Sequence, residues 1–243
     1  MSNICILGTG MAGFGAAHHV RERGQQAILF DKRGHYGGHT ASYLHEDRFT
    51  FDEGPHVSFT KDARVREILA DAIDQKYEKL DTKVNNYWQG HWIKHPAQVN
   101  LHGLPTDLVV KVISDFVDAQ HREPGEIRNY EDWLRASFGH TFAETFPMQY
   151  TIKYHTTDAR NLSTDWIGPR LYRAKLEEVL RGALMAHTPD VHYIEDFRYP
   201  SYGGFVSYLR RFMESSDLRL GHALKAIDPK RKEVSFENGT VVP

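Results

Sequence analysis

The sequence has one cysteine among its 243 residues, so no disulfide can form within the chain, and we expect a cytoplasmic protein. Its charges nearly balance, with 30 Lys and Arg against 32 Asp and Glu, which argues against a nucleic-acid-binding surface. No apolar run approaches the ~20 residues that a membrane helix needs. The first such run is broken by glycines, so we predict neither a signal peptide nor a membrane span.

A metal site is also not expected, although the chain has 15 histidines. His91 and His95 have the i, i+4 spacing of a helical ligand pair, but Gly90 and Pro96 argue against a helix there. The chain also lacks the G-x-S-x-G pattern of a serine nucleophile. We therefore predict no metal and no serine-hydrolase chemistry.

The stretch "ILGTGMAGFG" near the N-terminus is a short apolar run that enters three glycines, Gly8, Gly10 and Gly13. The apolar run predicts a buried parallel strand, and residues 11–23 have the pattern of a helix. A second apolar strand, "QAILFDK", ends at Asp31. Strand, glycine turn, helix, strand and acidic residue together predict a dinucleotide-binding βαβ unit.

Each part of this unit has a physical role in binding a dinucleotide. Gly8 permits the tight turn, Gly10 lets a pyrophosphate approach the backbone, and Gly13 lets helix and strand pack closely. The free N–H groups at the helix N-terminus, those of Met11 and Ala12 among them, then face the phosphates. The alternative is a glycine turn in an α/β fold that binds no nucleotide.

Two further motifs follow the second strand. "RGHYGGHTASY" contains Gly37-Gly38, which allows a second close approach of backbone to ligand. "RFTFDEGPHVSFT" alternates as a strand does and then enters the sequence Gly54-Pro55-His56. A plain NAD domain would instead continue with alternating strands and helices.

This order of motifs resembles the FAD-dependent oxidoreductase superfamily with two dinucleotide-binding motifs, which includes flavin amine oxidases, protoporphyrinogen oxidase, phytoene desaturases and UDP-galactopyranose mutases. "FDEGPH" is most similar to the mutase-like branch, and so is the run from "YEDWLRASFG" to "TDWIGPR". The sequence departs from the usual pattern at two positions. Asp31 stands where these proteins usually have Glu, and His39 stands where the oxidases often have Arg.

The resemblance implies an α/β protein with a three-layer ββα, Rossmann-like FAD-binding domain and an inserted, mainly helical substrate domain. We expect residues 1–75 and 190–243 to form the FAD-binding domain and residues 76–189 the inserted region. Members of the superfamily are longer, so we also expect that the sequence is truncated at its C-terminal end, or that another chain supplies the rest.

The resemblance also implies the residues of the site. His56 is the candidate catalytic residue, in the sense of positioning or tuning the flavin, whereas Asp52 is expected to order the local turn. The substrate candidates are Trp166, Arg170 and Arg173, because an arginine can bind a diphosphate through two hydrogen bonds. The alternative is that the aromatic residues are core and the arginines are solvated. The expected cofactor-binding residues are Gly8, Gly10, Met11, Ala12, Gly13, Asp31, Lys32, Gly37, Gly38, His39, Gly54, Pro55, His56 and Leu224.

The expected function is that of an FAD-dependent oxidoreductase or mutase acting through the flavin N5. The substrate would be a nucleotide sugar or a similar small molecule. The expected protein partner is either a second copy of this chain, in a homo-oligomer, or a complementing C-terminal chain. Two alternatives remain open. One is a hydride-transferring oxidase or desaturase, and the other is a non-catalytic nucleotide-binding fragment.

Overall fold

The computed structural model describes residues 4–123, 125–167, 173–189 and 196–243. The chain divides into two compact units, Met1–Asp81 with Asp196–Pro243, and Thr82–Glu195. We expected divisions at 75/76 and 189/190. The observed ones lie farther along the chain because β5 (Tyr77–Asp81) pairs antiparallel with β8 (Asp196–Pro200), which keeps both strands in the first unit.

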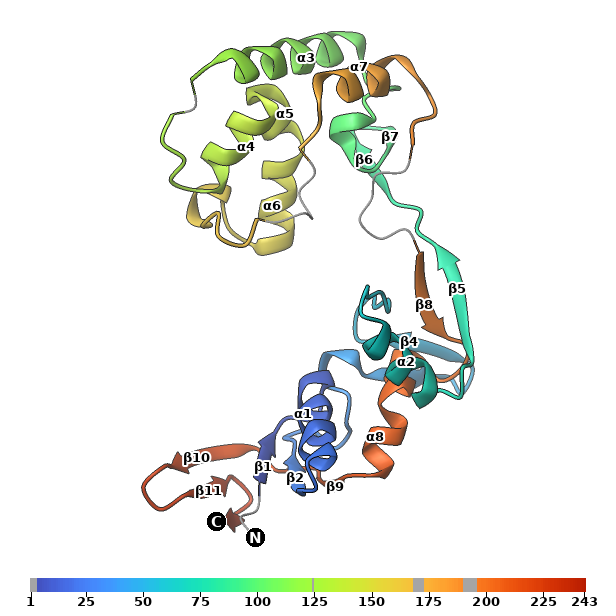
Figure 1. Cartoon of the computed structure of the whole chain (residues 1–243), viewed down its shortest axis with the longest axis vertical. Helices are drawn as coiled ribbons and strands as arrows, with labels where there is room; N and C mark the ends of the chain where they lie inside the picture. The colour runs from blue at the N-terminus through green and yellow to red at the C-terminus, as the bar shows by residue number, and fades with distance from the viewer. Residues whose placement is uncertain (1–3, 124, 168–172, 190–195) are drawn as a thin grey trace. The chain divides into compact units, whose positions relative to one another are not determined.

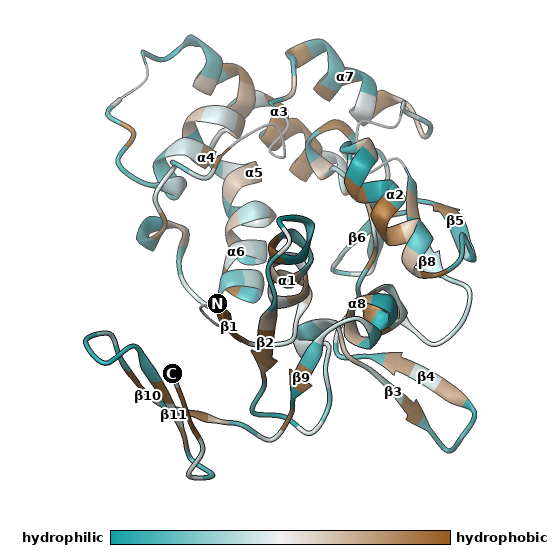
Figure 2. Ribbon diagram, turned by 60° about the horizontal axis from the view of Figure 1, so that its bottom comes forward, coloured by the Kyte–Doolittle hydropathy of each residue, from teal (hydrophilic) through white to brown (hydrophobic). Residues whose placement is uncertain are grey.

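A three-stranded parallel sheet lies at the centre of the first unit (Figures 1 and 2). Its strand order is β1-β2-β9, with β1 at Ile4–Leu7, β2 at Ala27–Phe30 and β9 at Asp217–Arg219. The helix α1 (Met11–Glu22) connects β1 to β2, as the sequence predicts. Both strands are coloured as hydrophobic in Figure 2, which fits a strand covered on both faces.

Successive side chains of β2 face opposite sides of this sheet. Leu29 packs with Phe14 of α1, whereas the ring of Phe30 stacks on that of Phe236 with centroids 4.6 Å apart. Phe236 belongs to a second, antiparallel sheet made of β10 (Leu224–Asp228), β11 (Glu233–Phe236) and β12 (Val241–Val242). The predicted three-layer ββα arrangement is therefore confirmed.

The other elements of the first unit lie between β2 and β9 along the sequence. They are η1 (Gly38–Thr40), the antiparallel pair β3 (Ser42–His45) and β4 (Phe49–Asp52), α2 (Ala63–Ala72), η4 (Phe205–Leu209) and α8 (Arg210–Glu214). The periodic run after Gly204 predicts one α-helix. The structure has a 3₁₀ segment, η4, followed by α8, and Gly204 begins it with a φ of +74°.

The second unit is mainly helical, with one hairpin at its start (Figure 1). Its buried core contains Leu101, Phe116, Leu134 and Phe142. The elements are β6 (Asn85–Trp88), β7 (His91–Lys94), η2 (Ala97–Val99), α3 (Thr106–His121), α4 (Tyr130–Phe138), α5 (His140–Thr145), α6 (Pro147–His155), η3 (Ala159–Asn161) and α7 (Leu176–Leu184).

Within the described part of the chain, no helix combines the length and the apolar character needed to cross a membrane. Nor do three or more His, Cys, Asp or Glu side chains in that part gather as a group that could hold a metal ion.

Candidate dinucleotide-binding site

The turn after β1 requires glycine at two positions, at Gly8 for its backbone conformation and at Gly13 for its close contact. Gly8 has a φ of +105°, which L side chains rarely adopt, and its N–H donates to Phe30 O at 2.7 Å. A Cβ atom on Gly13 would lie 2.0 Å from the carbonyl oxygen of Gly8. Gly13 therefore lets α1 start directly against the turn, the close packing that the sequence predicts for it.

The N-terminus of α1 has no side-chain cap among the described residues. Gly10 is the N-cap residue, and the first turn of the helix contains no acidic residue. The first hydrogen bond of the helix runs from Phe14 N to Gly10 O at 3.1 Å. The N–H groups of Met11, Ala12 and Gly13 therefore have no partner within the helix, which is the arrangement that binds anions.

A second glycine segment lies beside this turn. Gly37 N donates to Thr9 O at 2.9 Å, and a Cβ atom on Gly38 would lie 3.3 Å from the Cα of Gly10. The two glycine motifs, separated in sequence, are thus adjacent in space. His39 follows in η1 and is exposed, as is Lys32.

Asp31, at the end of β2, reaches back to the glycine turn. Its Oδ2 accepts from Thr9 N at 2.8 Å and from Thr9 Oγ1 at 2.6 Å, and its Oδ1 accepts from Arg33 N at 2.9 Å. Burial acts to raise the pKa of this carboxyl, but the hydrogen bonds from Thr9 and Arg33 outweigh it, so its pKa lies below the usual value. Asp31 is therefore a carboxylate at neutral pH.

Arg33, which the sequence does not single out as a site residue, connects the second glycine segment to Glu53. Its guanidinium donates to both carboxylate oxygens of Glu53 at 3.3 Å and to Gly38 O at 3.4 Å. Glu53 directly precedes Gly54 in the sequence. This pair fastens the "GPH" segment to the loop after β2. The only local signal for it is a basic residue two positions beyond Asp31.

His56 is held in one orientation by two contacts. Its Nδ1 lies 2.6 Å from Gly54 O, and its ring lies 5.2 Å from the Phe205 ring, measured between centroids. Because a carbonyl oxygen only accepts, Nδ1 carries the proton, and Nε2 of the neutral ring is the acceptor.

Asp52 fixes the segment that supports His56. Its Oδ1 accepts from Ser42 Oγ at 2.6 Å and from Phe205 N at 3.0 Å, and its Oδ2 accepts from Tyr199 Oη at 2.6 Å. Burial and the bond to Asp52 raise the pKa of the Tyr199 hydroxyl. Asp52 orders this turn, as expected, and Tyr199 is a partner that no local pattern indicates.

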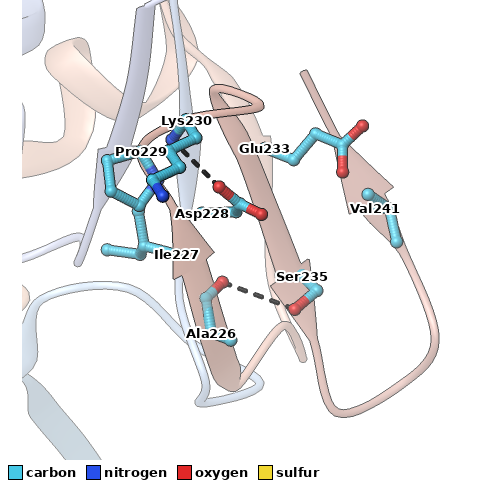
Figure 3. Close-up of a pocket in the computed structure, with 8 residues that line it drawn as sticks. All are labelled: Ala226, Ile227, Asp228, Pro229, Lys230, Glu233, Ser235 and Val241. Carbon is cyan, nitrogen blue, oxygen red and sulfur yellow. Dashed lines mark hydrogen bonds between the residues drawn. The ribbon is translucent and has the colours of Figure 1, made fainter.

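Leu224 begins β10 and is partly exposed, opposite Phe236 in the register. The face of this second sheet also bears a hollow of about 550 Å³, lined by Ile227, Asp228, Lys230 and Glu233 among others (Figure 3). None of the expected cofactor-binding residues lines this hollow.

In the second unit, two of the three substrate candidates connect to one aromatic cluster. The Trp166 ring lies 4.9 Å from Tyr130, whose ring lies 6.0 Å from Trp133. The Arg173 guanidinium lies over Trp133 at 5.8 Å, and its Nε donates to Ser137 Oγ at 3.3 Å. Arg170 lies outside the described residues.

Trp166 remains 48% exposed, so it is not a core residue. Tyr130, by contrast, is buried. Burial raises the pKa of its hydroxyl to about 12.

The first unit fits a dinucleotide on three observations. No side chain in the described part of the chain caps the N-terminus of α1, the turns at Gly10 and Gly38 present backbone without side chains, and a carboxylate directly follows β2. The fold and these features together define a Rossmann-like dinucleotide-binding domain.

Comparison with known proteins agrees with this class. Residues 6–72 match the NAD(P)-binding Rossmann-like domain family. The whole chain superposes on reduced UDP-galactopyranose mutase with a TM-score of 0.91 and 28% identity, covering 100% of this chain and 54% of the mutase.

Two other solved structures share the fold at lower identity. A protein described as a protoporphyrinogen oxidase from Exiguobacterium sp. 255-15 has a TM-score of 0.71 and 18% identity, with 99% of this chain and 58% of that one covered. A putrescine oxidase redesigned in cofactor binding has a TM-score of 0.61 and 16% identity, with 99% and 55% covered.

The chain therefore contains a Rossmann-like dinucleotide-binding domain within residues 6–72, and it shares its fold with a UDP-galactopyranose mutase and with the two oxidases. It spans between 54% and 58% of the length of these three structures.

Proposed function

We propose that the first unit holds FAD with its pyrophosphate at the N-terminus of α1. The uncapped N–H groups there and the side-chain-free approach at Gly10 and Gly38 support this placement. In the proposal, Asp31 contacts the ribose, Leu224 lies near the adenine, and His56 lies at the flavin ring. The other contributing residues are Gly8, Met11, Ala12, Gly13, Lys32, Gly37, His39, Gly54 and Pro55.

The proposed reaction class is that of a UDP-galactopyranose mutase-like enzyme acting on a nucleotide sugar. One observation carries this proposal: the match to the mutase covers 100% of this chain, with a TM-score of 0.91. FAD would supply the reactive N5 atom, while the protein binds and orients the reactants. Because His56 Nδ1 is held by Gly54 O, its Nε2 is the atom available to accept a hydrogen bond from the cofactor.

The substrate would bind on the second unit, at the cluster that links Trp166 to Arg173. Exposed aromatic rings suit a sugar or a base, and a guanidinium suits a diphosphate. Arg170 would supply a second guanidinium. The single cysteine, Cys5, is free, which supports a reducing compartment such as the cytoplasm as the location.

The first experiment titrates the purified chain with FAD and follows flavin fluorescence and absorbance. We expect saturable binding at one site per chain. A purified chain that neither carries flavin nor binds added FAD would refute the proposal that the first unit holds this cofactor.

The second experiment distinguishes a mutase from an oxidase. Flavin-loaded, dithionite-reduced protein is incubated with UDP-galactopyranose, and the products are separated for the furanose form. Substrate-dependent reduction of the oxidised flavin under anaerobic conditions, without furanose, would instead indicate an oxidase. H56Q should impair turnover, while H45Q, at an exposed histidine of β3, is the matched control.

A further inference from the structure

Thr9 is the central residue of the glycine turn and has no exposed surface. Its N–H and its hydroxyl both donate to the same oxygen of Asp31, Oδ2, at 2.8 and 2.6 Å. Its carbonyl accepts from Gly37 N at 2.9 Å. Thr9 therefore ties Asp31 to both glycine motifs.

This arrangement limits what Asp31 can still bind. A carboxylate offers about four acceptor positions, two on each oxygen. Thr9 occupies both positions on Oδ2, and Arg33 N occupies one on Oδ1 at 2.9 Å. One acceptor position remains, on Oδ1, whereas a ribose presents two neighbouring hydroxyl groups.

We propose that Asp31 recognises only one of the two hydroxyls on the adenosine ribose, and that Thr9 is the positioning residue that imposes this restriction. The inference rests on the proposed dinucleotide site and adds the selectivity of that site between the two ribose hydroxyl groups. The short side chain of Asp31 agrees with this proposal. A Glu side chain has one more methylene group, which would carry its carboxylate away from the turn.

The test uses isothermal titration of the full chain, free of flavin, with ADP, 2′-deoxy-ADP and 3′-deoxy-ADP. A hydrogen bond to a charged group contributes about 1.5–3 kcal/mol, which corresponds to a loss of roughly 10- to 150-fold in affinity. We expect one deoxy analogue to lose that much and the other to bind within about threefold of ADP.

The variant T9V removes the hydroxyl donor but keeps the shape of the side chain, and so opens one position on Oδ2. The affinities of T9V for the two deoxy analogues should then differ by less than about threefold, because Asp31 can accept a hydrogen bond from either ribose hydroxyl. T9S keeps the hydroxyl and should retain the wild-type preference. D31N should lose the preference, while D228N, at an exposed aspartate that ends β10, should retain it.

Three results would overturn the inference alone, provided that ADP binds. They are equal losses for both analogues, no loss for either, and an unchanged preference in T9V. Absence of ADP binding, in a chain that also fails to bind FAD, would overturn this inference together with the proposed function.

Discussion

Replacement of Gly13 by alanine tests whether the glycine turn depends on close contact between backbones. The added Cβ would lie 2.0 Å from Gly8 O and 3.0 Å from Gly8 C. Real Cβ atoms essentially never approach closer than 3.0 Å, so helix and turn must separate by about 1 Å. Both atoms belong to the backbone, so no side-chain rotation can relieve the clash.

The magnitude follows from two opposing effects. Overpacking of this kind costs about 1–3 kcal/mol or more, and the better helix propensity of alanine recovers at most about 1 kcal/mol. Gly15 is the matched control, because it lies two residues farther along α1 and an added Cβ there meets nothing within 4 Å. G15A should therefore be stabilising by about 0.5–1 kcal/mol.

Thermal and urea unfolding of the two variants, together with FAD titration, measure this difference. At about 2–4 °C per kcal/mol for a chain of this size, the unfolding midpoints of G13A and G15A should lie on the order of 5–10 °C apart. G13A should also lose FAD affinity, because a displaced turn moves the N–H groups of α1. Equal midpoints, or a G13A protein that binds FAD like the wild type, would show that the contact is not needed.

Three further predictions concern other parts of the chain. G182A should destabilise the helical unit despite its position inside α7, because the new Cβ would lie 2.1 Å from Val99 O, and urea unfolding followed by tryptophan fluorescence would detect this. D52N replaces one acceptor oxygen of Asp52 with an amide NH₂ group, which would face the N–H and O–H groups that now donate to the carboxylate. The substitution should therefore lower the free energy of unfolding by about 1–3 kcal/mol. An unchanged urea midpoint would contradict the role of Asp52. Because burial raises the pKa of Tyr130 to about 12, above its value of about 10 in the unfolded chain, its contribution to stability is complete below pH 10 and is lost as the pH rises toward 12. Y130F cannot ionise and should lose less stability over that interval in parallel unfolding series. Identical pH dependence in the two proteins would refute this.

The elements that carry the site could be predicted from the sequence because each has a strong local pattern. The strand, glycine turn, helix and second strand lie within 31 consecutive residues, and their periods and glycines are visible without any partner. The turn at Asn238-Gly239 likewise indicates the β11–β12 connection. Local patterns are sufficient where an element's own residues determine its geometry.

The partners of the site residues could not be predicted in the same way. Tyr199 and Asp52 are separated by 147 positions, and nothing near either residue indicates that they meet. The 3₁₀ geometry of η4 has a similar origin. Phe205 N is bound to Asp52, and Gly204 lies so close to Ser42 that a Cβ atom would come within 2.4 Å of its hydroxyl oxygen. Tertiary contacts therefore override the α-helical period at this point.

Asp31, which follows β2, and Asp52, which ends β4, illustrate how similar residues acquire different roles. Asp31 and Asp52 each accept three hydrogen bonds from the protein. The donors to Asp31 come from Thr9 and Arg33, which flank the proposed ligand position, so its remaining acceptor faces the same region. The donors to Asp52 come from three distant segments. Asp52 therefore connects β4 to β3, β8 and η4, and its effect on the proposed flavin position would act through Phe205 and His56. Sequence alone shows two acidic residues at strand ends, and only their hydrogen-bond donors distinguish the carboxylate that we propose to bind the ligand from the structural one.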